Sequence, residues 1–173
     1  MTEAPEDLSF SEMRKALKGM LTMGHAAWAI YMSQLVENIL ADELTSKMAI
    51  PSNTFKARIF EGYGPLSSFN AKIDIARALE IVDDETYNTL RILKSIRNEF
   101  AHPKSMPNFD DAAIVKECRK LPGYADDENC FSLFSDVVAS IIVRIDDSED
   151  AKGLAEELRG IGAAQKAFAK KSP

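Results

Sequence analysis

Three residues near the middle of the chain have side-chain types and spacing that could do chemistry together. Arg97, Asn98 and His102 form the pattern R-N-x-x-x-H, directly before Pro103. Histidine can transfer a proton near neutral pH, and arginine can stabilise charge on a phosphate without itself titrating. These roles suit metal-independent transesterification of RNA. In that reaction His102 would move the proton, Arg97 would hold the phosphate oxygens and Asn98 would orient the site.

Arg97 breaks the helical pattern of its own segment. When residues 87–102 are drawn on a helix at ~100° per residue, apolar side chains occupy one arc and polar side chains the other. Arg97 falls inside the apolar arc, between Leu90 and Leu93. A buried guanidinium without a partner is costly. Arg97 must therefore be paired, lie at an interface or line a cleft.

Three interpretations of Arg97 stay open from the sequence. It could pair with a carboxylate of another helix, such as Glu37 or Asp42, with its stem along the apolar surface. It could lie in a polar pocket that binds an anion. It could pair across a dimer interface while Asn98 and His102 close the helix end, which would make the motif architectural. An ideal helix separates Arg97 and His102 by ~140°, so a shared site needs an unwound last turn or a second subunit.

Other polar side chains near this segment are candidates for contact with a phosphate or another anion. These residues are Arg91, Lys94, Lys72, Ser67 and Ser68. The first two precede Arg97 at intervals of three and form a small basic ridge. The serines follow Gly-Tyr-Gly-Pro at a helix start, where backbone amides attract anions, and Lys72 is one turn further on. The alternatives are a tight turn with a helix cap, and a solvated ridge paired with Asp83, Asp84 or Glu85.

The motif and the stretch before it resemble two known groups of proteins. R-N-x-x-x-H near a helix end resembles the signature of the HEPN superfamily, whose all-α domains usually dimerise and include ribonucleases and RNA-binding modules. G-P-L-S-S-F-x-A-K-I, followed by I-R-N-E-F-A-H, resembles the mannitol-operon repressor family of bacteria, in which we expect glycine near Glu80. The resemblance implies an all-helical, dimeric regulator of carbohydrate-operon transcription. Such a regulator lacks a DNA-reading helix-turn-helix and acts through a protein partner.

The elements that must position these residues are helices, because apolar residues recur at helical spacing and no convincing alternating strand is present. We expect helices near residues 9–18, 28–40, 69–79, 84–101, 111–118, 131–142 and 149–170, and one or two helical turns at 54–60. In the helix at 69–79, Phe69, Ile73, Ala76 and Leu79 form the apolar stripe. These seven or so helices predict one compact all-α bundle over residues 1–173, with residues 1–8 and about 163–173 flexible.

Composition narrows the classes of function. The chain has 173 residues, of which 46% are apolar and 28% charged, as in an ordinary globular domain. The formal net charge of −6 argues against sequence-specific binding to duplex DNA, which depends on cations that neutralise phosphates. RNA remains a possible partner through a small basic groove. Without a signal peptide, and with no apolar run near the ~20 residues of a membrane span, we expect a cytoplasmic protein that does not bind membranes.

Metal and thiol chemistry are not expected. The chain has two histidines, and its two cysteines, Cys118 and Cys130, fit neither a zinc site nor a disulfide framework. His25 is expected to be a core or surface residue. From the family resemblance we expect a homodimeric, non-enzymatic regulator, and we expect no cofactor. The second hypothesis is a metal-independent endoribonuclease or RNA-binding module that uses Arg97, Asn98 and His102.

Overall fold

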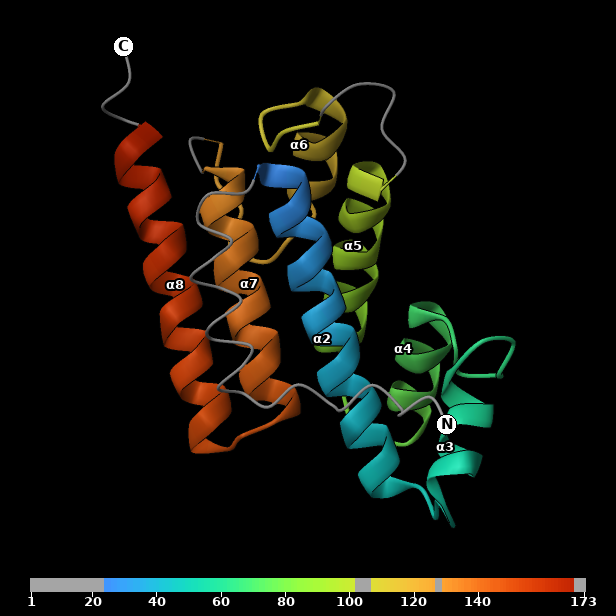
Figure 1. Ribbon diagram of the computed structural model, residues 1–173. Coiled ribbons are helices and arrows are strands. Elements are labelled where there is room, and N and C mark those ends of the chain that lie inside the picture. Colours follow the sequence, from blue (N-terminus) through green and yellow to red (C-terminus); the bar gives the residue numbers. More distant parts are fainter. Residues whose placement is uncertain (1–23, 102–106, 127–128, 170–173) are drawn as a thin grey trace.

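The computed structural model describes residues 24–101, 107–126 and 129–169 (Figure 1). Within these ranges the chain forms seven α-helices and no strand, which confirms the predicted all-α fold class. The helices are α2 (His25–Lys47), α3 (Asn53–Phe60), α4 (Phe69–Ala78), α5 (Asp84–Ala101), α6 (Ala112–Cys118), α7 (Cys130–Ile145) and α8 (Glu149–Ala169). The helix expected at residues 9–18, the segment 1–8 and His102 lie outside the described residues.

Four long helices form the body of the molecule. α7 and α8 lie antiparallel and make the largest contact between any two elements, and α2 packs against α7 (Figure 1). α5 packs against α2, while α4 contacts both α2 and α5. α6 packs against α5 and α7 at the far end of the body from α3 and α4 (Figure 1). Within the described ranges, no helix is long and apolar enough to cross a bilayer.

The apolar stripes predicted from spacing meet in one core. Trp28 of α2 is 2% exposed and stacks on Phe131 of α7, and its indole N–H donates to Ser135 Oγ at 3.2 Å. His25 packs against the rings of Phe109 and Phe131, and its Nδ1 accepts a hydrogen bond from the Phe109 amide at 3.2 Å. His25 is therefore a packing residue at the start of α2, as expected.

Side-chain caps close several helix starts. Ser68, Ser148 and Asp83 each accept a hydrogen bond from the amide three residues further on, at the starts of α4, α8 and α5. The bond from the Thr86 amide lowers the pKa of Asp83. Asp111 lies at the start of α6 without capping it, because its carboxylate accepts a hydrogen bond from the Asn108 amide.

The end of α4 corrects one prediction. Phe69, Ile73 and Ala76 are buried as expected, whereas Leu79 is 48% exposed. α4 ends at Ala78, and Glu80 takes a positive φ of 57°, so the amides of Glu80 and Ile81 bond back to the carbonyls of Arg77 and Ala76. Glycine is usual at this left-handed position after a helix, because it has no Cβ to clash. Glycine is also the residue that the family resemblance predicts near position 80.

Replacing Glu80 with glycine should raise the free energy of unfolding by about 1 kcal/mol. The substitution removes the steric cost of a Cβ in the left-handed region. Part of this gain is offset, because glycine has more backbone entropy in the unfolded chain. Urea denaturation measures the change. Glu61→Gly is the matched control, because Glu61 is also exposed at a helix end but has a φ of −117°, so its replacement should lower stability. A loss of stability for Glu80→Gly equal to that of the control would contradict the interpretation.

Candidate functional site

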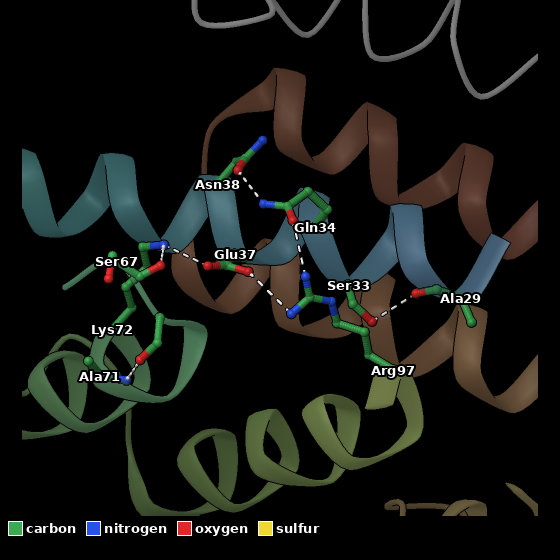
Figure 2. Close-up of polar contacts among 10 residues, drawn as sticks. Ala29, Ser33, Gln34, Glu37, Asn38, Ser67, Ala71, Lys72 and Arg97 are labelled. Atoms are coloured by element: carbon green, nitrogen blue, oxygen red, sulfur yellow. Dashed lines mark hydrogen bonds and ion pairs between the residues drawn. The ribbon is translucent and has the colours of Figure 1, made fainter. Parts of the chain in front are cut away.

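Arg97 of α5 lies against α2, on the face that the helical projection predicts. Its side chain is 29% exposed, and its guanidinium points at Glu37 and Gln34 (Figure 2). Nη1 is 3.8 Å from Oε2 of Glu37, and Nη2 is 3.5 Å from Oε1 of Gln34. Of the three interpretations left open by the sequence, the structure therefore contains the pairing with a carboxylate of another helix. Asp42, the other carboxylate considered, is paired with Lys56 at 3.4 Å.

Glu37 holds a second and closer cation. Lys72 Nζ of α4 lies 2.6 Å from Oε1 of Glu37, and the two side chains are only 8% and 7% exposed (Figure 2). Lys72 Nζ is also 3.5 Å from the carbonyl oxygen of Ser67. Unpaired buried charges are costly, so each of these two groups requires the other. One carboxylate thus serves two cations, Lys72 and Arg97, which leaves this cluster with a net charge of +1.

A hollow of about 490 Å³ opens beside the cluster of Lys72, Glu37 and Arg97. Its other polar walls are Gln34, Ser67, Ser68, Asn70 and Lys94. Lys94 Nζ donates to the side-chain oxygen of Asn70 at 2.8 Å. The hollow is therefore lined by three cations and one carboxylate, in a protein whose formal net charge is −6. Four of the five predicted anion-binding residues meet here.

The loop of residues 62–68 places the two serines at the hollow. A Cβ at Gly64 would clash with the carbonyl oxygens of Arg58 and Ile59, so the close approach of this loop to α3 requires glycine. The Leu66 amide then donates to the Ile59 carbonyl at 2.9 Å. Ser68 Oγ caps α4 by accepting a hydrogen bond from the Ala71 amide at 3.2 Å. The interpretation of this segment as a tight turn plus a cap is confirmed.

Arg91 is not brought to the hollow. Its Nη1 donates to the hydroxyl of Tyr87 at 2.9 Å, and that hydroxyl donates to Asp74 at 3.1 Å. Lys94 and Arg97 line the hollow, so the proposed ridge of three cations is divided. The acidic residues considered as partners for the ridge pair elsewhere: Asp84 with Arg77, and Asp83 and Glu85 with Arg144.

The two described residues of the R-N-x-x-x-H motif do not converge. Asn98 is exposed, whereas the adjacent Arg97 is directed at α2. His102 lies outside the described residues.

Gln34 and Asn70 line the hollow but do not stand out in the sequence. Gln34 precedes Glu37 by three positions, so both side chains lie on one face of α2. Asn70 is linked to Asp74, four residues further on, by a 2.8 Å hydrogen bond. The signal that could have identified Gln34 is its spacing of three positions from Glu37, a charged residue within the apolar stripe of α2.

Comparisons of the chain with protein-family models, curated proteins and solved structures each found no match. The resemblance to the mannitol-operon repressor family therefore rests on the residues quoted above and stays a prediction.

The two cysteines belong to the core and do not line the hollow. Cys118 ends α6 and Cys130 begins α7, and both are buried and neither forms a disulfide. Burial, together with the neighbouring Cys130 thiol, raises the pKa of Cys118 far above its ordinary value. A thiol with a raised pKa stays protonated at neutral pH and is a poor nucleophile.

Cys118 should be almost unreactive toward Ellman's reagent in the native protein at neutral pH. The reagent needs an accessible thiolate, and both burial and the raised pKa oppose one. The measurement uses a Cys130→Ser variant, in which Cys118 is the only thiol, with and without denaturant. Rapid labelling of the folded variant would contradict the buried, protonated state.

Replacing Glu37 with glutamine should lower the free energy of unfolding by about 3 kcal/mol, because Lys72 would be left buried without a counter-charge. Urea denaturation measures this loss. Glu43→Gln is the control, since Glu43 pairs with the exposed Lys47 at 3.5 Å and should change stability by less than about 1 kcal/mol.

A double variant separates this ion pair from general disruption. Glu37→Gln combined with Lys72→Met should recover part of the lost stability, because the unpaired ammonium is removed with its partner. Strictly additive losses, or equal losses for Glu37→Gln and Glu43→Gln, would contradict the pairing.

Proposed function

We propose that this protein is a bacterial regulator similar to the mannitol-operon repressor, which modulates transcription through a protein partner and has no catalytic activity. The observation that carries the proposal is the separation of Arg97 from Asn98. In a ribonuclease site of the R-N-x-x-x-H kind, Arg97 would hold the phosphate oxygens and Asn98 would orient the site, so both side chains would face one space. Here Arg97 is bound by Glu37 and Gln34, and Asn98 is exposed. This separation favours a motif with an architectural role.

Two further features support the regulatory proposal. This chain departs from the resembled family at Glu80, where glycine is expected, but Glu80 keeps the left-handed conformation that glycine usually adopts. The net charge of −6 favours action through a protein over direct reading of duplex DNA. A homodimer is part of the proposal, and light scattering of the purified protein measures it.

A metal-independent ribonuclease is the second candidate function. The feature that favours it is the hollow itself, because Lys72, Lys94 and Arg97 could neutralise an RNA phosphate there.

Deletion of the encoding gene should change the transcript level of a carbohydrate-uptake operon, since the regulator is removed. Complementation with the wild-type gene should restore that level. His102→Ala should restore it equally, because the proposed function uses no general acid or base. Quantitative measurement of the operon transcripts in the three strains provides the test.

The purified protein gives the matching biochemical outcomes. It should leave RNA intact in EDTA at high protein concentration, and it should not shift operator DNA at physiological salt. RNA cleavage that disappears in both Arg97→Ala and His102→Ala would replace the proposal with the ribonuclease. Tight, sequence-specific binding to operator DNA would overturn action through a partner.

A further inference from the structure

We propose that the hollow between α2, α4 and α5 binds a small phosphate monoester. This inference goes beyond the regulatory role, because it concerns a ligand of the isolated protein. It would hold whether or not the protein acts on transcription.

The walls of the hollow carry a surplus of positive charge. Glu37 offers one carboxylate to two cations, and Lys72 and Glu37 are almost fully buried. Arg97 Nε is also buried, and it has no hydrogen-bond partner within the described part of the chain. Lys94 adds a third cation to the walls of the hollow. Lys94 and Arg97 are only partly exposed, and partly buried charges are screened less than fully exposed ones, so an anion in the hollow would be stabilised.

Hydrogen-bond donors from several elements line the hollow. A phosphate monoester carries two negative charges near neutral pH and three acceptor oxygens. Lys94 and Arg97 approach from α5, and the hydroxyl of Ser67 belongs to the loop before α4. Phe69 and Asn70, at the start of α4, also line the hollow, and the first amides of a helix lack an intrahelical acceptor. These donors come from separate elements and surround one space, which suits a group with several acceptor oxygens.

The hollow is larger than a phosphate group. Its volume of about 490 Å³ falls in the range of small-molecule sites. The side-chain amides of Gln34 and Asn70 line it and already bond to neighbouring side chains. Each amide keeps a second N–H and a second oxygen lone pair for a hydroxyl group. The walls therefore fit a monoester with a small polar body.

The surroundings favour a small ligand over a nucleic-acid strand. A single strand needs cations that continue along its backbone. The next cation along α5, Arg91, is bound to Tyr87 outside the hollow, and Asp74 lies directly behind Asn70. A second phosphate on that side would meet a carboxylate.

Calorimetric titration of the purified protein at low salt tests the site. The probes are glycerol 3-phosphate and ribose 5-phosphate, with glycerol and ribose as neutral counterparts and inorganic phosphate as a further arm. Both esters should bind with a Kd below about 1 mM, and the neutral compounds should not bind. Tighter binding of the esters identifies an ester as the occupant, whereas equal affinity for inorganic phosphate supports the phosphate site with the free anion as occupant.

Two matched variants locate the binding. Lys94→Gln should weaken ester binding at least about tenfold, because it removes a charge-assisted hydrogen bond without touching the Lys72–Glu37 pair. Arg91→Gln removes the same charge one turn earlier on α5 and should weaken binding less than about twofold. Thermal unfolding without ligand confirms that both variants are folded.

Three outcomes would overturn the inference: absence of binding for every phosphate probe, equal weakening in the two variants, or an oligoribonucleotide that binds more tightly than the esters and displaces them. These results are separate from those of the transcript measurement. Ester binding that depends on Lys94 stands even if the deletion leaves transcripts unchanged.

Discussion

The carboxylate of Glu37 connects three helices that are distant in the sequence. Glu37 belongs to α2, Lys72 to α4 and Arg97 to α5, and each cation lies within ion-pair distance of the same side chain. Because the Lys72–Glu37 contact is almost dry, neither group can exchange its partner for water without a large cost. The placement of α4 and α5 against α2 is therefore linked to one buried acidic residue.

This single interaction has consequences for both proposals. It directs Arg97 toward α2 and away from the exposed Asn98, which argues against their joint use in catalysis. The two cations paired with Glu37 also carry more charge than one carboxylate neutralises. They lie at the edge of the hollow, whose walls include a third cation, Lys94. The pairing of Arg97 with Glu37 thus disfavours a ribonuclease site, whereas the excess positive charge of the same cluster favours a site for a small anion.

Much of the local structure could be predicted from the sequence, because helical periodicity and caps act over a few residues. The start of α4 at Ser68 follows from such rules. Helical periodicity also places Arg97 among apolar residues of its own helix. Glu37 could be named as a possible partner because it lies on another helix.

The remaining features depend on tertiary structure or on a single backbone angle. A helical projection gives the face of a residue but not the helix that opposes it. The sequence therefore could not pair Lys72 with Glu37, 35 positions away, or separate Arg91 from Lys94. Leu79 satisfies the apolar period of α4 but is exposed, since the chain turns at Glu80.

The central claim is that Lys72, Glu37 and Arg97 form one buried cluster, and NMR of the lysine side chains tests it most directly. The account predicts that the Lys72 ammonium protons exchange slowly with water and show a through-hydrogen-bond coupling to the Glu37 carboxylate carbon. The exposed Lys47 serves as the fast-exchanging reference. Exchange at Lys72 as fast as at Lys47, with no coupling to Glu37, would contradict the account.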